Sequence, residues 1–532
     1  MRLKYPSLRV LLLLLVYGCT NPIEDIKIVI DTNVIKHSAL ITVTDPQQPG
    51  KTPANISLSV GGRDSAFVYE ISGKREFKVT DGMIALGIAP GKTINKDSPA
   101  ECLITVSAPG YLPSSQTLSF SAEQSQQLIT VNLIKAISPP PGVSIAQKSA
   151  ALTEGQLSQA FKTETPLQNK NESATVAFSR STAFNNEDKT IKGKLLLLSL
   201  SHFDSHTPAS LQLFPGGLLS KGVTLPDGST GTINFSTAGF FRLSLTVDNT
   251  PVSSADRDMA FALSIDPGLT NPGTGKTVTA GDKIGVWYYD EKSGKWAFLQ
   301  QALIENAGNS KLSARFSSNA AGYYALCWYT VSCTNTLQVN VHTKNTNAGN
   351  GFIAAFFNST DFFPYYVYRL DLSASSSSFS YKNLPQGLTK VAIFDYSAFN
   401  TWQSSGAGTS APTPLTESGW IEACTSAPLD LSIPAGGPAS EITLEFTGYC
   451  PLNQNLAIRP SMYVSFRESG TSSYQYLGYM NKGTLTTKAL TPGKSYDFKS
   501  SYNGETIKVS RRIEQSTVSE KVQLPESTCK SF

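Results

Sequence analysis

The chain has 532 residues, with 44 Lys and Arg against 40 Asp and Glu, and charged residues make up 16% of it, compared with about 25% in ordinary soluble domains. A chain of this length suggests three to five domains, each long enough to bury its own core. The near balance of charges excludes the basic footprint of a nucleic-acid-binding protein, so no nucleic-acid partner is expected.

The first eighteen residues have the three zones of a secretion signal. A stretch with three basic residues is followed by an apolar run over residues 10–16 and by the small residue Gly18 before Cys19. Because the run is much shorter than the roughly 20 residues that cross a bilayer core, residues 1–18 are predicted to be a signal peptide and not a transmembrane helix.

The tetrapeptide VYGC at residues 16–19 resembles the lipobox of bacterial lipoproteins. The resemblance implies that Cys19 is acylated, becomes the mature N-terminus and holds the protein on a membrane, where two or three acyl chains make a lasting anchor. Thr20, together with the acidic pair Glu24 and Asp25, resembles the sorting signals of outer-membrane and surface lipoproteins of Bacteroidetes-type bacteria. We therefore expect a lipid-anchored outer-membrane protein at the cell surface. A plain signal peptide with an incidental cysteine is the alternative.

Beyond the signal, short alternating apolar and polar runs bounded by Gly, Pro, Asn and Asp recur to the end of the chain. This pattern predicts an all-β protein of tandem β-sandwich domains. One short helix is expected over residues 152–160. The predicted segments are a lipidated tether (19–23), an Ig-like or transthyretin-like sandwich (24–137), a proline-rich linker (138–142), a second β-domain (143–331) and two sandwich repeats (332–449 and 450–532).

Two of these segments resemble known modules. The sequence APGYLP at 108–113 resembles carboxypeptidase-regulatory-like and related Ig-like modules of Bacteroidetes surface proteins, which implies a small sandwich without an activity of its own. The sequence IGVWYYDEKSGKW at 284–296 predicts a β-hairpin that turns at Ser293 and Gly294. With neighbouring motifs such as TAGF at 237–240, this hairpin resembles the ZU5-related β-domains of extracellular proteins, which are scaffolds.

The last two segments are predicted to be diverged copies of one unit. Each opens on a cysteine, continues with an aromatic strand and a loop containing Pro and Gly, and carries another cysteine near its end. An exported chain can oxidise its thiols, so we predict one disulfide in each copy, and we expect the two cysteines in apolar strands to be buried thiols. The predicted disulfides are Cys333 with Cys424 and Cys450 with Cys529, and the buried thiols are Cys102 and Cys327.

One histidine pair has the spacing of a metal site. His202, Asp204 and His206 would share one face of a strand, and two imidazoles with a carboxylate can hold zinc or iron. A solvated turn at the end of a strand is the alternative, and no fourth ligand is visible, so neither a metal nor a cofactor is predicted. The sequence PGTGKT at 272–277 lacks the first glycine of a nucleotide-binding loop, because Thr270 takes its place.

The best candidates for ligand contact are aromatic. Tyr365, Tyr366, Tyr368 and Trp402 could pack against sugar rings or form a protein-binding hot spot, although packing in a strand core is the alternative. The sequence favours a non-catalytic, lipid-anchored envelope protein, a scaffold for binding, adhesion or assembly with an envelope protein or a glycan as partner. A glycan-binding lipoprotein of a polysaccharide uptake system and, less strongly, a hydrolase are the alternatives. Any binding is expected at the C-terminal end, farthest from the anchor.

Overall fold

The protein is described here from a computed structural model. It describes residues 28–31, 34–48, 51–95, 98–122, 125–167, 172–187, 189–308, 311–343, 351–359, 363–370, 376–396, 398–399, 402, 411–424, 427–434, 441–451, 453–471, 474–524 and 526–529. Strands account for nearly all of the regular structure, which confirms the predicted all-β fold of tandem sandwiches. Single-turn helices are η1 (Ser65–Phe67), α2 (Pro208–Leu211) and α4 (Glu526–Cys529). Residues 396, 398, 399 and 402 are also helical.

The first sandwich follows the predicted alternation of buried and exposed residues only in part. Along β6 (Ala100–Ser107) most residues that face the other sheet are buried, whereas β5 (Met83–Ile88) is buried at every position. One face of β5 packs in the core and the other meets the C-terminal sandwich. The two sheets run β4-β5-β2-β8 and β3-β6-β7, where the other strands are β2 (Ser38–Thr44), β3 (Ser57–Gly61), β4 (Val68–Glu70), β7 (Ser114–Phe120) and β8 (Gln126–Asn132).

The second sandwich is one long sheet that folds over itself. Strand β23 (Lys295–Gly308) pairs with β22 (Lys283–Asp290) in one layer and with β24 (Lys311–Ala320) in the other, and an apolar cluster fills the space between the layers. The remaining strands are β9 (Val143–Thr153), β10 (Gln156–Leu157), β11 (Phe161–Glu164), β12 (Ala174–Phe178), β13 (Phe184–Asn186), β14 (Lys189–Thr190), β15 (Leu195–Phe203), β16 (Leu219–Thr224), β17 (Thr230–Val247), β18 (Thr250–Pro251), β19 (Ser254–Ile265) and β25 (Gly322–Val331), beside the separate hairpin β20 (Thr270–Asn271) and β21 (Lys276–Thr277).

The predicted helix over residues 152–160 is wrong. Leu152 pairs with Leu157 across a tight turn in which Glu154 and Gly155 have φ angles of 52° and 81°. Positive φ at two successive positions is typical of a hairpin turn and ends any helical run. The Ser293-Gly294 hairpin, in contrast, forms as predicted between β22 and β23.

The third and fourth sandwiches have the same strand order. In the third, sheet β29-β26-β33 faces sheet β28-β27-β30, and in the fourth, β38, β34 and β41 face β37-β36-β39-β40. In both, the first strand pairs in parallel with the last strand of the unit. The strands are β26 (Thr336–Thr343), β27 (Phe352–Asn358), β28 (Tyr366–Leu370), β29 (Ser376–Lys382), β30 (Leu388–Asp395), β31 (Thr416–Glu417), β32 (Ile421–Glu422) and β33 (Leu429–Ile433), then β34 (Ile442–Cys450), β35 (Asn453–Arg459), β36 (Met462–Glu468), β37 (Gln475–Met480), β38 (Thr484–Thr487), β39 (Ser495–Tyr502), β40 (Glu505–Arg512) and β41 (Thr517–Gln523).

Two strands lie in different units from those that the sequence suggested. Strand β34, expected at the end of the third segment, is the central strand of the fourth sandwich, because Cys450 ends a strand whereas Cys333 precedes one. Strand β1 (Ile28–Asp31), expected in the first sandwich, pairs in parallel with β35 instead. The N-terminus is therefore attached to the C-terminal unit.

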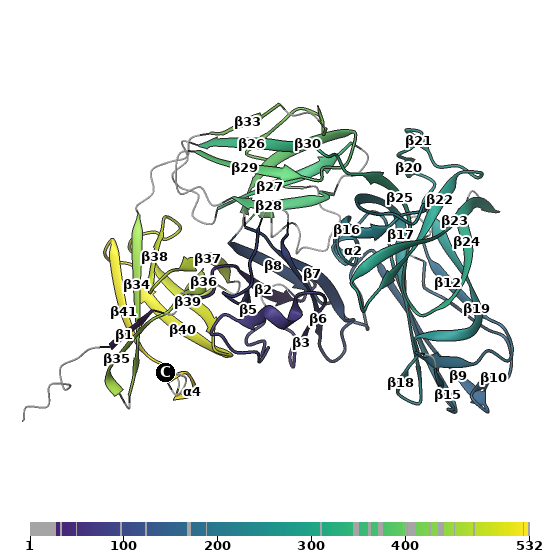
Figure 1. Ribbon diagram of the computed structural model, residues 1–532, viewed down its shortest axis with the longest axis horizontal. Helices are drawn as coiled ribbons and strands as arrows, with labels where there is room; N and C mark the ends of the chain where they lie inside the picture. Colours follow the sequence, from purple (N-terminus) through teal and green to yellow (C-terminus); the bar gives the residue numbers. More distant parts are fainter. Residues whose placement is uncertain are drawn as a thin grey trace, which may run out of the picture.

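The four sandwiches are not a linear string. Figure 1 shows the fourth sandwich at one end, the second at the other, and the first and third side by side between them. One buried apolar cluster includes residues from all four sandwiches, such as Met83, Phe214, Phe394 and Tyr463. Interfaces between domains of one chain are usually small and polar and allow relative motion. A shared apolar cluster instead favours one rigid body.

Candidate functional site

The three tyrosines predicted to contact a ligand lie in the core of the third sandwich or partly within it. Tyr365 is 5% exposed, and its hydroxyl lies 2.7 Å from the hydroxyl of Thr389. Tyr366 stacks on Tyr381 with ring centroids 4.0 Å apart, and Tyr368 stacks in the same way on Phe379. Because these stacking faces are occupied by other rings, the structure contradicts the prediction of an aromatic platform at Tyr365 and leaves Tyr366 and Tyr368 half-buried.

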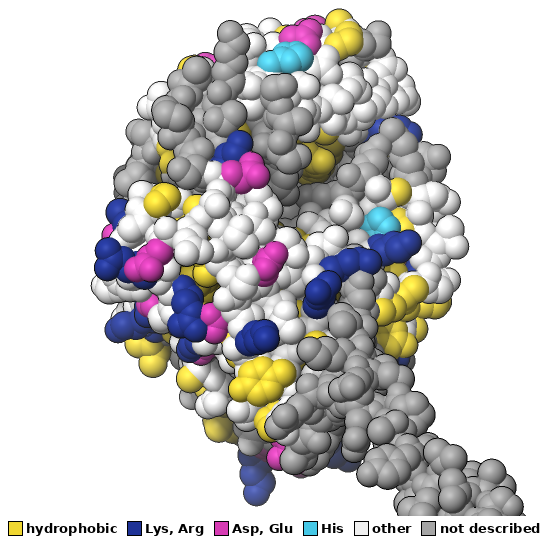
Figure 2. All heavy atoms as spheres, turned by 90° about the vertical axis from the view of Figure 1, so that its left-hand side faces the viewer, with side chains coloured by type: hydrophobic (Ala, Val, Ile, Leu, Met, Phe, Trp, Pro, Cys, Tyr) yellow, Lys and Arg dark blue, Asp and Glu magenta, His cyan; other side chains and the backbone are white. Residues whose placement is uncertain are grey.

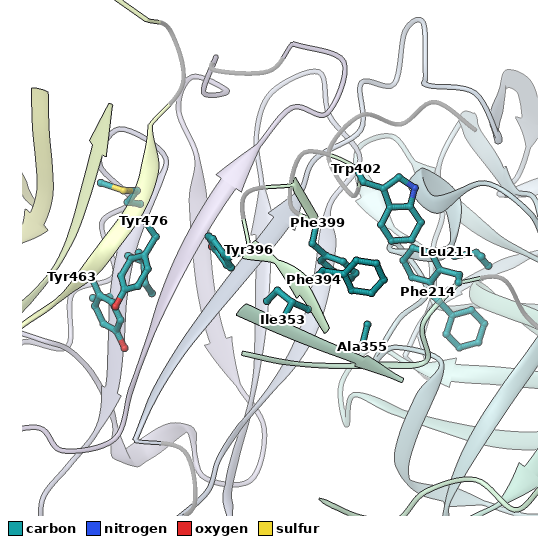
Figure 3. Close-up of a cluster of buried hydrophobic side chains, with 14 of the residues drawn as sticks. Leu211, Phe214, Ile353, Ala355, Phe394, Tyr396, Phe399, Trp402, Tyr463 and Tyr476 are labelled. Atoms are coloured by element: carbon teal, nitrogen blue, oxygen red, sulfur yellow. The ribbon is translucent and has the colours of Figure 1, made fainter. Parts of the chain in front are cut away.

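Trp402 is also an interior residue. It is 5% exposed, and its ring lies 5.6 Å from that of Phe363 and 5.4 Å from that of Phe399. The same cluster includes Leu211 and Phe214 of the second sandwich, and Figure 3 shows these side chains around the junction. The prediction that Trp402 contacts a ligand is therefore wrong: the side chain holds two sandwiches together.

The histidine pair lies inside the second sandwich and not in an exposed turn. His202 and Asp204 are completely buried. Neither ring nitrogen of His202 has a hydrogen-bond partner, and burial lowers its pKa to about 3, so the ring is neutral. Asp204 caps the following turn by accepting hydrogen bonds from the backbone N–H groups of His206 and Thr207.

These groups do not form a metal centre. Among the residues that the structure describes, no three His, Cys, Asp or Glu side chains lie close enough together to hold a metal ion. His206 Nε2 lies instead 2.7 Å from Asp266 Oδ2. Nearby, burial and then the charge of Asp204 raise the pKa of Glu172 to about 8. Glu172, Asp204 and Asp266 are buried. None of these acids lines the cavity within the fourth sandwich or the cavity between the first and second sandwiches.

The predicted disulfide pairing is present. Cys333 is joined to Cys424 and Cys450 to Cys529, which close loops of 91 and 79 residues. Each bond ties the beginning of a sandwich to its end. Cys102 and Cys327 are buried and belong to neither disulfide. The predicted lipidation residue Cys19 and the tether 19–23 lie outside the described residues, in which no helix is long and apolar enough to span a membrane.

The attachment of the N-terminal strand is the feature that sequence reasoning missed. Residues Ile28 to Asp31 pair with Leu456 to Arg459 in register. A four-residue apolar strand carries no local signal of its partner, since any exposed sheet edge can receive it. The expectation that the C-terminal end lies farthest from the N-terminus is therefore wrong.

The first and fourth sandwiches meet through polar contacts around β5. The hydroxyls of Ser38 and Tyr463 lie 2.9 Å apart in the buried part of the junction. At its rim, Lys508 Nζ lies 2.5 Å from Asp81 Oδ2, and this contact lowers the pKa of Asp81. Figure 2 views the molecule from the end that holds the fourth sandwich, where basic and acidic side chains are interspersed.

Arg369 contacts aromatic rings of both the third and the fourth sandwich. The guanidinium carbon of Arg369 lies 4.6 Å from the ring centroid of Tyr396 and 4.1 Å from that of Tyr476. A guanidinium between two aromatic faces gains a cation–π attraction from each. The fourth sandwich is thus fixed by contacts to β1, to the first sandwich and to the third.

No protein-family model matches the chain, and no curated protein matches it. Among solved structures the chain is similar to the Bacillus anthracis TIE protein, at 13% identity and a TM-score of 0.12. The match covers 71% of this chain and 57% of the TIE chain, so this chain spans less than two thirds of the length of the TIE protein. It is also similar to the major pilin subunit BcpA of Bacillus cereus, at 9% identity and a TM-score of 0.14, over 92% and 99% of the two chains. Two B repeat units of the collagen-binding protein of Staphylococcus aureus match at 10% identity and a TM-score of 0.12, over 89% and 98%. Because these TM-scores are so low, we infer neither fold nor function from the matches, and the fold is assigned from the strands described above.

Proposed function

We propose that this protein is a non-catalytic, lipid-anchored envelope protein that serves as a rigid scaffold for binding, adhesion or assembly at the cell surface. The observation that supports this most is the pairing of β1 with β35. Eight residues lie between Cys19 and Ile28 in the sequence, and the nine steps of an extended chain from Cys19 to Ile28 reach at most about 32 Å. A lipid on Cys19 would therefore hold the fourth sandwich close to the membrane.

The arrangement of the units then sets which surfaces face outward. The second sandwich lies at the opposite end of the molecule from the fourth (Figure 1). An anchor on the N-terminal strand would present the second sandwich away from the membrane, and the apolar cluster shared by all four units would keep it there. Rigid presentation of one domain is what a scaffold requires, since a partner then meets a preformed surface and less entropy is lost on binding.

Lipidation and placement can be tested together in cells. Metabolic labelling with an alkyne fatty acid should mark the wild-type protein, and the label and the membrane association should both be lost in Cys19→Ser. Cys102→Ser, which changes a buried thiol instead, should keep both. Digestion of intact cells with an added protease should degrade the protein if it is exposed at the cell surface. A Cys19→Ser protein that remains labelled, or a wild-type protein that resists the protease, would contradict the proposal.

A further inference from the structure

A cavity of about 170 Å³ lies between the first and second sandwiches. Its walls come from β6 and β7 on one side and from β16 and the β22–β23 hairpin on the other. The tip of the hairpin is seated on the first sandwich: a Cβ at Gly294 would lie 3.1 Å from Leu103 Cδ1. One water needs only about 10–15 Å³, so the cavity has room for a small organic molecule.

The charged groups at this cavity favour an anion. Arg63, Lys221 and Lys295 line it together with one acid, Glu101. Arg63 is engaged by the first sandwich, where it donates to Asp64 at 3.0 Å and to the Pro99 carbonyl. Among the residues that the structure describes, neither Lys221 nor Lys295 has an acidic partner. The two ammonium groups thus add positive charge that the fold itself does not neutralise.

The other lining groups are suited to a polar ligand. Thr117, Ser119, Ser220 and Ser293 line the walls. The Ser220 hydroxyl already donates to the Gly217 carbonyl at 2.6 Å, so it can only accept a hydrogen bond from a ligand. Hydroxyls both donate and accept hydrogen bonds, so they can serve the hydroxyls of a sugar, whereas lysines serve a carboxylate or phosphate. The Lys295 amine lies next to Gly222, which has a φ of +65°. A Cβ built on Gly222 would lie 3.0 Å from Lys295 Nζ. Any larger residue at Gly222 would displace the amine.

We propose that this cavity binds a small sugar-like anion, a uronic acid or a sugar phosphate, with Lys221 and Lys295 holding the anionic group. The shared chemistry is an anionic group, a carboxylate or a phosphate, on a polyhydroxylated body. The ligand would contact both sandwiches and so stiffen the junction that presents the second sandwich. This inference concerns the folded body and does not depend on the lipid anchor.

Isothermal titration calorimetry on the purified full-length protein tests the proposal at low ionic strength. Galacturonate and galactose 6-phosphate are the two anionic probes, which share one sugar, and galactose is the neutral control. At least one anion should bind, and Lys221→Ala/Lys295→Ala should weaken it by a factor of about 10 to 100, as expected for the loss of charged hydrogen bonds. Whichever anion binds more tightly identifies the carboxylate or the phosphate as the natural group.

The matched control is Lys276→Ala, which removes an exposed lysine from the separate β20–β21 hairpin of the same sandwich. It should leave the affinity unchanged. Binding of neither anion, equal binding of galactose, or equal loss of affinity in Lys276→Ala would each overturn the proposal. Because both lysines are exposed at the rim of the cavity, the double variant should unfold at the same temperature as the wild type, which separates loss of binding from loss of folding.

Discussion

The guanidinium of Arg369 in the third sandwich lies 4.1 Å from the ring centroid of Tyr476 in the fourth. The guanidinium carbon of Arg369 also lies 4.6 Å from the ring centroid of Tyr396 in the third sandwich. The contact joins two units that the chain connects only through residues 434–441. Such contacts distinguish a rigid body from a string of independent domains.

Arg369→Ala should loosen this junction. Each cation–π contact contributes about 0.5 to 2 kcal/mol, so we expect the free energy of unfolding to fall by about 1 to 3 kcal/mol. We also expect faster proteolysis near residues 434–441. Limited digestion with a glutamyl endopeptidase, which can cleave after Glu441, followed by mass spectrometry measures the effect, because the chain has no Lys or Arg between Lys390 and Arg459 for trypsin. Arg180→Ala, on the exposed surface of the second sandwich, should change neither quantity. Equal digestion of the two variants would mean that Arg369 does not hold the units together.

Trp402→Ala should destabilise the protein without changing its retention on a polysaccharide relative to the wild type. The side chain is buried between Phe363 and Phe399, and truncating a buried Trp typically costs about 3 to 5 kcal/mol. Urea unfolding monitored by circular dichroism measures the loss. A variant of wild-type stability that had lost retention on a polysaccharide would restore the glycan-platform hypothesis.

The disulfides should stabilise the two C-terminal sandwiches separately. Loops of 91 and 79 residues correspond to about 4 kcal/mol each on the loop-entropy model. We expect Cys333→Ser/Cys424→Ser to lower the hydrogen-exchange protection of β26 and β33 while the fourth sandwich keeps its protection. The reciprocal variant, Cys450→Ser/Cys529→Ser, should do the opposite. Uniform loss of protection in both variants would show that the sandwiches unfold as one unit.

The stability of the second sandwich should depend on pH through two buried groups. Burial raises the pKa of Glu172 to about 8, so between pH 4.5 and 8 the folded state binds more protons than the unfolded state and stability falls as pH rises. Burial lowers the pKa of His202 to about 3, so between pH 3 and 6.5 the unfolded state binds more protons and stability rises with pH. The sum is a plateau from about pH 4.5 to 6.5, with a decline on either side.

Two substitutions separate these contributions. Glu172→Gln should remove the fall in stability above pH 6.5, and His202→Phe should remove the fall in stability below pH 4.5. Each of these falls amounts to a few kcal/mol, on the order of magnitude expected from the pKa shifts. Urea unfolding followed by tryptophan fluorescence is suitable, because Trp287 and Trp296 are buried in this sandwich. Glu76→Gln, at an exposed position of the first sandwich, is the control. An alkaline decline that persisted in Glu172→Gln would refute the assignment.

Local features of the fold could be predicted from the sequence. The hairpin between β22 and β23 depends on turn residues beside two alternating strands, and the disulfides follow from two cysteine pairs of similar spacing in two similar segments. Each of these signals lies within one unit of the chain.

Features that depend on contacts between units could not be predicted. The aromatic run at Tyr365 has the same composition whether its rings face a core or solvent, and Trp402 packs in a cluster that includes residues of a neighbouring sandwich. The position of His202 within its own sandwich depends on strands β9 and β17, which flank β15. The pairing of β1 with β35 joins residues more than 400 positions apart, and nothing within Ile28–Asp31 indicates it.

The central claim is that the N-terminal strand is attached to the fourth sandwich. Val29 and Ala457 are register partners in adjacent strands, within the range of distances that a disulfide can bridge. The full-length protein with Val29→Cys and Ala457→Cys should therefore form a cross-link that non-reducing peptide mapping detects. Val29→Cys with Val522→Cys is the control, because β41 lies beyond β34 on the opposite side from β35. Efficient cross-linking of only the first pair is the predicted result. No cross-link at Ala457, or an equal yield at Val522, would contradict the account.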